Sequence, residues 1–310
     1  MKRRVLSDLL VIRHPIDFLR ETLKVSGLKE HAPAGVVVTA AYHMAVRLYR
    51  GEFDGYFKCD TNYHDFAHAA ETLLTMARLI HGAQLASKKI AQRDLAVGLT
   101  AAILHDAGYI RTSAESTEKG ACFRAEHEMR SMAFVLQHGE AIGLTPSEIA
   151  ECQTMIQSTM MTEDVNAMSF QSGTHELLAR MLSVSDLLAQ LSSATYLERL
   201  FFLYEEDRDS GAPGYQNPLD CCRKAISFDE RARARLKNNL EQADVYLVNH
   251  FNARWHTPGN LYRISMDRQL KYLTGVVEQD GFDPRCHLRR WGSVKALRGL
   301  LAENRIATPG

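Results

Sequence analysis

The chain has 310 residues, of which 45% are hydrophobic and 24% are charged, and its formal net charge is +0. This is a globular composition with enough apolar material for a large buried core. The neutral balance creates no overall field that would attract nucleic acid or an anionic membrane, so neither partner is expected.

The cysteines indicate a reducing environment. None belongs to a Cys-x-x-Cys pair, which argues against a zinc ribbon or a thioredoxin-like motif. Scattered thiols in a chain of this size suit the cytoplasm. The basic start at Met1 is followed by a short apolar run that Ser7 and Asp8 interrupt, so we expect no signal peptide. No window is long enough to span a membrane. The six cysteines are Cys59, Cys122, Cys152, Cys221, Cys222 and Cys286.

Nearly every segment between turn-forming residues has the apolar periodicity of a helix. The predicted fold is therefore all-α, one compact domain over residues 1–310, or a domain with a C-terminal helical subdomain over 219–310. The β-branched run at Val36 leaves a short strand as the alternative for the second helix. Loops are expected at 51–62, 107–121 and 162–173, and a linker at 205–218. Helices are predicted near 15–26, 34–49, 63–82, 93–106, 123–138, 146–159, 174–189, 191–204, 228–251, 261–278 and 292–303.

The chemically most informative stretch lies at the start of the third predicted helix. It reads Asn62-Tyr63-His64-Asp65-Phe66-Ala67-His68-Ala69 and places two histidines four residues apart. If Asn62 caps the helix, His64 and His68 lie on one helical face, one turn apart. Both imidazoles would then point to the same place, where either could bind a metal ion.

Two further segments supply carboxylates. His105 and Asp106 follow a run from Leu95 to Leu104 that is nearly all apolar, and a helix that is apolar all round belongs in the interior. Asp186 stands in a third predicted helix among leucines and a valine. A carboxylate in such surroundings is costly unless it is paired or bound to a metal ion. Two imidazoles and two carboxylates can thus meet in the core.

In this order the segments resemble a known family. Residues 62–69 resemble the Tyr-His-Asn-x-x-His-Ala signature of class I cyclic-nucleotide phosphodiesterases. Ala102-Ile103-Leu104-His105-Asp106 is similar to their His-Asp motif, which the wider HD phosphohydrolase superfamily shares. Met155-Ile156-Gln157-Ser158-Thr159-Met160 resembles the helix that lines their site, and Ser185-Asp186-Leu187 resembles the segment with their last metal ligand. The match covers residues 62–190.

The resemblance implies a two-metal site. His68, His105, Asp106 and Asp186 would hold the first divalent ion, and Asp106 would bridge to a second ion held mostly by water. The first position suits zinc, iron or manganese, and the second suits magnesium or manganese. His64 would be the general acid. The implied reaction is hydrolysis of a cyclic nucleotide such as cAMP or cGMP to the nucleoside 5′-monophosphate by a metal-bridging hydroxide.

Four residues are candidates for substrate contacts: Tyr63, His127, Thr159 and Gln269. His127 would contact phosphate or add to the second metal, as a later histidine does in many HD proteins. The alternative for His127 is a surface histidine between two acidic neighbours. His175 and His256 are expected to be structural.

The chain also departs from the family pattern. Tyr109 stands where a second histidine is usual, Ala189 stands where an asparagine touches the base, and Leu270-Lys271-Tyr272 follows the glutamine in place of Gly-Phe. The metal ligands therefore match the family better than the base pocket does. An HD-type nucleotidase or phosphomonoesterase remains open, as does a nucleotide-binding sensor without hydrolysis. The expected partner is a small phosphoester, and the oligomeric state stays open.

Overall fold

The computed structural model describes residues 5–9, 12, 14–279, 290, 292 and 299. Within these ranges the chain forms α-helices and short 3-10 helices, with no β-strand, which confirms the all-α prediction. The α-helices are α1 Ile16–Ser26, α2 Pro33–Arg50, α3 Phe66–Leu85, α4 Gln92–Leu104, α5 His127–His138, α6 Pro146–Gln157, α7 Gly173–Leu191, α8 Tyr196–Asp209, α9 Pro218–Asn238, α10 Tyr246–Trp255 and α11 Leu261–Val277. The 3-10 helices are η1 Leu6–Asp8, η2 Ala107–Tyr109, η3 Gly120–Phe123, η4 Glu140–Ile142, η5 Val165–Ala167 and η6 Ala243–Val245.

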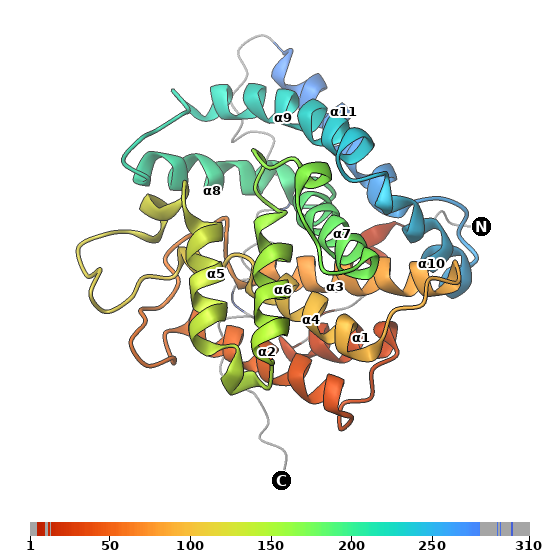
Figure 1. Ribbon diagram of the computed structural model, residues 1–310. Helices are drawn as coiled ribbons and strands as arrows, with labels where there is room; N and C mark the ends of the chain where they lie inside the picture. The colour runs from red at the N-terminus through yellow and green to blue at the C-terminus, as the bar shows by residue number, and fades with distance from the viewer. Residues whose placement is uncertain are drawn as a thin grey trace.

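Helices α3 and α4 form the centre of the fold. Every residue from Leu95 to Leu104 is buried, as the apolar run there predicts. Helix α3 packs against α1, α4, α7 and α10, and α4 packs against α2, α6 and α7. In Figure 1 α3 and α4 lie in the middle of the molecule, with α8, α9 and α11 above them and α1 and α2 below. Side chains at the ends of these two helices are therefore delivered to the interior.

The start of α3 differs from the prediction. The N-cap is Asp65, whose carboxylate accepts the backbone N–H of His68 at 3.2 Å. The expected cap at Asn62 is wrong, and His64 precedes the helix instead of standing on it. Aspartate and asparagine are equally good caps, so composition alone could not choose between them. The shift separates the two histidines, because only His68 has the fixed direction of a helical side chain.

Later segments show further differences. The strand alternative at Val36 is wrong, because α2 is a continuous helix. Helix α8 runs on to Asp209, which leaves only 210–217 of the expected linker. The long helix expected over 228–251 is broken after α9, where Glu241 and Gln242 have φ values of 48° and 54°. Two successive left-handed residues cannot belong to a right-handed helix.

The end of the chain lies largely outside the described residues. The helix expected near 292–303 falls there. The helices α9, α10 and α11 pack against α3, α7 and α8, and their buried residues belong to the same core cluster as the rest of the fold. No helix in the described ranges combines the length and apolar character that crossing a bilayer requires.

The first turn of α6 carries a capping box that an arginine extends. The Thr145 hydroxyl accepts the Glu148 N–H at 3.3 Å, and the Glu148 carboxylate accepts the Thr145 N–H at 2.8 Å. Arg93 donates from Nε to the same carboxylate at 2.7 Å. These hydrogen bonds, that from Arg93 above all, lower the pKa of Glu148 to about 2.

We expect Glu148→Gln to lower the free energy of unfolding at neutral pH by about 1 kcal/mol, because water partly screens this pair at the surface. The pKa of Glu148 is lower in the folded chain than its ordinary value of 4.5, so its contribution is present above that pH and is lost as the pH falls toward 2. Urea denaturation of both proteins across this range should show the difference shrinking with acidity. A difference that stays constant would contradict the assignment.

Candidate metal centre

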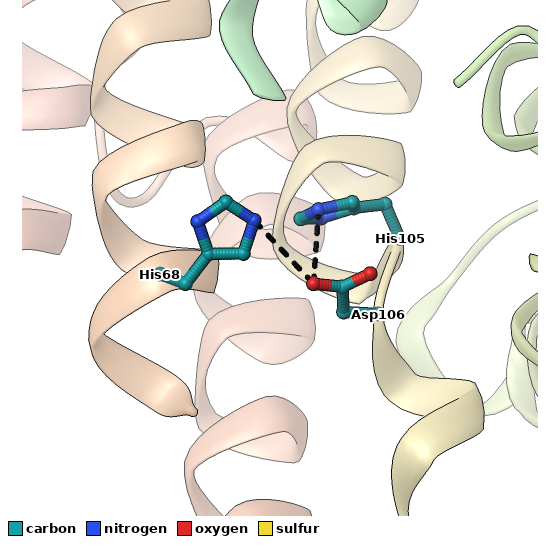
Figure 2. Close-up of side chains that lie close together, drawn as sticks. All are labelled: His68, His105 and Asp106. Carbon is teal, nitrogen blue, oxygen red and sulfur yellow. Dashed lines mark ion pairs between the residues drawn. The ribbon is translucent and has the colours of Figure 1, made fainter. Parts of the chain in front are cut away.

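Three helices bring the predicted metal ligands together. His68 lies in the first turn of α3, His105 and Asp106 follow directly after α4, and Asp186 stands in the second half of α7. His68, His105 and Asp106 are 2%, 1% and 2% exposed. Figure 2 shows both imidazoles directed at the Asp106 carboxylate. Residues far apart in sequence thus share one buried point, and these three could hold a metal ion.

The distances describe a shared centre. His68 Nε2 lies 3.0 Å from Asp186 Oδ1 and 3.4 Å from Asp106 Oδ2. His105 Nε2 lies 3.3 Å from Asp106 Oδ2 and 3.6 Å from Asp186 Oδ1. Each imidazole therefore faces both carboxylates, and the two nitrogens and two oxygens enclose one position.

The tautomer of His105 indicates that a cation fits the position between these four atoms. His105 Nδ1 lies 2.9 Å from the Ala102 carbonyl, so Nδ1 carries the hydrogen and the Nε2 lone pair faces the carboxylates. His105 Nε2 and Asp106 Oδ2 are both buried without a hydrogen-bond partner. Lone pairs that converge in a buried space repel one another unless a cation lies between them. The donor set therefore fits a divalent ion, and the backbone hydrogen bond orients the ligand.

The pKa of His105 also indicates that positive charge is favoured at this position. Burial alone favours the neutral imidazole, but Asp106 and Asp186 outweigh it and raise the pKa of His105 to about 9. In the absence of a metal ion a proton thus balances the carboxylates. A metal ion that binds here must displace this proton, so its affinity should weaken as the pH falls.

The second oxygen of Asp106 faces another histidine. His127 Nδ1 lies 2.8 Å from the Arg124 carbonyl, so its hydrogen is placed there. His127 Nε2 then presents a lone pair to Asp106 Oδ1, 3.5 Å away. The His127 side chain is only 16% exposed, so His127 is not a fully solvated surface residue. Asp106 thus has a histidine beside each of its two carboxylate oxygens.

His64 lies beside the metal centre and has a different partner. Its Nδ1 makes a short hydrogen bond with the buried carboxylate of Glu206, which also accepts the backbone N–H of Tyr63 at 3.1 Å. Burial by itself favours neutral His64, but Glu206 outweighs it and raises the pKa of His64 above its ordinary value. Correspondingly, His64 holds the pKa of Glu206 below its usual range against the effect of burial. His64 is thus equipped to carry a proton.

Tyr109 occupies the space between His64 and His127. Its ring stacks on His64 at a centroid distance of 4.3 Å and an angle of 11°, and on His127 at 4.4 Å and 27°. Tyr109, which stands where the resembled family has a histidine, thereby holds the planes of both imidazoles.

The remaining candidates for substrate contacts lie apart from one another. Tyr63 is 1% exposed, and Arg199 lies over its ring at 5.2 Å, so its position is in the core. The Thr159 hydroxyl donates to the Ile156 carbonyl at 2.7 Å, which ends α6. Gln269 lines a cavity that none of the four predicted metal ligands borders. The structure therefore gathers the predicted metal ligands with His64 and His127, whereas Gln269 lines a separate cavity.

Two acidic residues were not predicted. Glu206 lies in the Glu205-Glu206-Asp207 run, which resembles a solvated linker in sequence but belongs to α8. Glu128 lies beside His127, with Oε2 3.1 Å from Nδ1, and burial with the nearby Asp106 raises the pKa of Glu128 to about 7. No sequence signal identifies Glu206, because residues 205–218 are predicted to be a linker, whereas α8 continues to Asp209.

The residues define the class of site. His68, His105 and Asp106 could hold a metal ion at one buried point, with Asp186 Oδ1 3.0 Å from His68, and imidazole and carboxylate donors suit a divalent ion. Comparison of the chain with protein-family models, curated proteins and solved structures found no match. What the centre does chemically must therefore be argued from its own residues.

Proposed function

We propose that the protein is a metal-dependent phosphohydrolase that cleaves a phosphodiester, with a cyclic mononucleotide as its first substrate. The observation that carries the proposal is the hydrogen-bonded pair of His64 and Glu206 beside a buried centre of two histidines and two aspartates. A metal site that merely stabilised a fold would have no use for a separate, carboxylate-supported proton donor. The resemblance of residues 62–190 to cyclic-nucleotide phosphodiesterases supports the same class.

Each residue has a role in this proposal. His68, His105, Asp106 and Asp186 would hold the first ion, and Asp106 with His127 the second. When bound, two divalent ions in such a site activate a water molecule and neutralise the phosphoryl oxygens. The shell of α-helices excludes bulk water from three of the ligands, which are almost completely buried. Charges act more strongly in such an environment than in water.

His64 supplies the proton that the leaving group needs. The Glu206 carboxylate accepts the hydrogen at Nδ1 and thereby orients the ring, so the Nε2 proton is the one available for transfer. Stacking on Tyr109 also holds the plane of the His64 ring. The alkoxide that departs from phosphorus is a strong base, and protonation by a positioned acid typically contributes about 10²–10⁴-fold in rate.

A substrate panel tests the proposal. Purified protein is assayed with cyclic mononucleotides, nucleoside monophosphates and cyclic dinucleotides, each with magnesium, manganese or zinc. We expect hydrolysis of a cyclic mononucleotide to the 5′-monophosphate that depends on the added metal. Activity confined to nucleoside monophosphates would favour the nucleotidase, an alternative that Ala189 at the base-contact position motivates. Nucleotide binding without turnover under any metal would favour the sensor.

A further inference from the structure

A cavity of about 600 Å³ lies away from the metal centre, between α3, the end of α7 and α11. Its size is that of sites for small organic ligands. The cavity wall includes apolar residues of η1, α1, α3 and α8 and two tyrosines of α11, which together suit an organic body: Leu6, Phe18, Leu74, Leu197, Tyr262 and Tyr272. Hydroxyl groups of Thr75, Ser192, Ser193, Thr195 and Ser265 complete the wall.

Arg78 is the unusual residue of this wall. It is only 4% exposed, and its Nε is buried without a hydrogen-bond partner. Its NH1 donates to the Tyr262 hydroxyl at 2.7 Å. Within the described ranges it makes no ion pair and no other hydrogen bond. An unpaired buried guanidinium is costly, so the cavity lacks the partner that this group requires.

Among the described residues, the cavity wall carries more positive than negative side chains: Arg78, Arg268, Arg290, Glu71 and Glu198. Arg268 and Arg290 are exposed to solvent, whereas Arg78 is buried. Glu71 is already paired with Arg199, whose guanidinium lies 3.1 Å away. Glu198 accepts the backbone N–H of Arg290 at 2.7 Å and forms no ion pair with Arg78. Neither carboxylate of the described wall therefore serves as the counter-ion of Arg78.

The positive charge of Arg78 also affects the pKa of a buried histidine nearby. His250, which is fully buried, has its pKa lowered to about 2, first by burial and then by Arg78. A neutral His250 cannot act as a cation, and it offers no negative charge to Arg78. His250 therefore does not supply the counter-ion that Arg78 lacks among the described residues.

We propose that this cavity binds a small organic oxyanion, a phosphate or carboxylate compound of about nucleotide size, with Arg78 as its counter-ion. The planar guanidinium suits such groups because its N–H donors form a fork that matches two oxygens. Arg78 follows His68 by ten residues on α3, which places their backbones about 15 Å apart along the helix axis. The site is therefore a second one, separate from the metal centre.

The test uses Arg78→Met, which removes the charge and keeps the length of the side chain, with Arg223→Met as the matched control on the exposed side of α9. Binding of inorganic phosphate, AMP, GMP and citrate is measured by calorimetry, and melting temperatures are recorded in chloride buffer with and without each anion. We expect at least one anion to bind the wild type and to raise its melting temperature. Affinity should fall at least about tenfold in Arg78→Met and stay unchanged in the control.

The melting temperature of Arg78→Met in the absence of any added anion provides a second test. Because Arg78 has no counter-ion in the unliganded chain, Arg78→Met should melt no lower than the wild type in chloride buffer. A clearly lower melting temperature would mean that Arg78 is structural and would overturn the proposal. So would equal binding by both proteins, or no binding of any of the four anions. If Arg78→Met does not fold, Arg78→Lys must fold and bind more weakly than the wild type, and failure of both variants also overturns it.

This test is independent of the proposed function. Phosphate held by metal ions would bind equally well to Arg78→Met, whereas anions in the cavity would still bind to His105→Ala. If no substrate in the panel is hydrolysed, the expected role of Arg78 in anion binding is unchanged.

Discussion

Replacing His105 by alanine is expected to lower metal affinity by more than about 100-fold and to abolish hydrolysis. Loss of a residue that merely orients a ligand typically costs 10–100-fold, and His105 is itself a ligand that its backbone hydrogen bond orients. The metal content of protein purified without chelator checks this result. Melting curves with and without added manganese provide a second readout, since an ion that binds only the folded chain stabilises it.

Controls separate metal loss from general damage. His31→Ala removes an exposed histidine and should keep wild-type metal content. Asp186→Asn replaces one carboxylate oxygen at constant shape, so it should also lose metal without opening a cavity. Should His105→Ala and Asp186→Asn both retain a full complement of metal, the ion lies elsewhere and the centre is wrongly assigned.

His64→Gln is expected to lower kcat by about 10²–10⁴-fold while metal content stays intact. The reason is the proposed division of roles between the two histidines, in which His68 would bind metal and His64 would donate a proton. Metal analysis and kcat are therefore measured on the same preparation. Full activity of the variant would show that the proton comes from another group. A metal-loaded structure with both imidazoles on one ion would also overturn the division.

The pH profile of Glu206→Gln examines the same pair. Glu206 raises the pKa of His64, and the donor form of His64 exists below that pKa. Activity of the wild type should therefore be lost as the pH rises through the pKa of His64. Without the carboxylate this alkaline limb should move to lower pH. If the maximal activity falls but the alkaline limb keeps its position, Glu206 orients the His64 ring without changing its pKa.

The hydrophobic pattern of the sequence predicted more about the residues of the candidate metal centre than about the helix ends and breaks elsewhere in the fold. The apolar run before His105 and the leucines around Asp186 predicted buried helices, and the resemblance to a known family implied which residues on them would be ligands. Asp65 in place of Asn62 as the helix cap was not predictable, because both residues cap helices well. The break at Glu241 and Gln242 was also hidden, since neither residue is a helix breaker. There Arg180 of α7 donates to the Asn239 carbonyl, a tertiary contact that local sequence cannot reveal.

Glu206 and Arg78 escaped sequence analysis for a related reason. Each belongs to a residue type that is usually exposed. Arg78 stands in a segment with ordinary helical periodicity, and Glu206 stands in a run that resembles a linker. Their significance comes from partners far along the chain or from the lack of one. Glu206 meets His64 across 142 residues, and Arg78 is notable because no carboxylate approaches it in the described ranges. Neither property is encoded in spacing.

The order of the ligands along the chain also affects how the protein is made. His68, His105 and Asp106 leave the ribosome early, whereas Asp186 follows His68 by 118 residues. At about 5–20 residues per second, roughly 6–24 s separate the synthesis of these two ligands. Glu206, the partner of the proposed proton donor His64, is translated later still. A nascent chain can therefore contain three of the four proposed ligands well before His64 gains its partner.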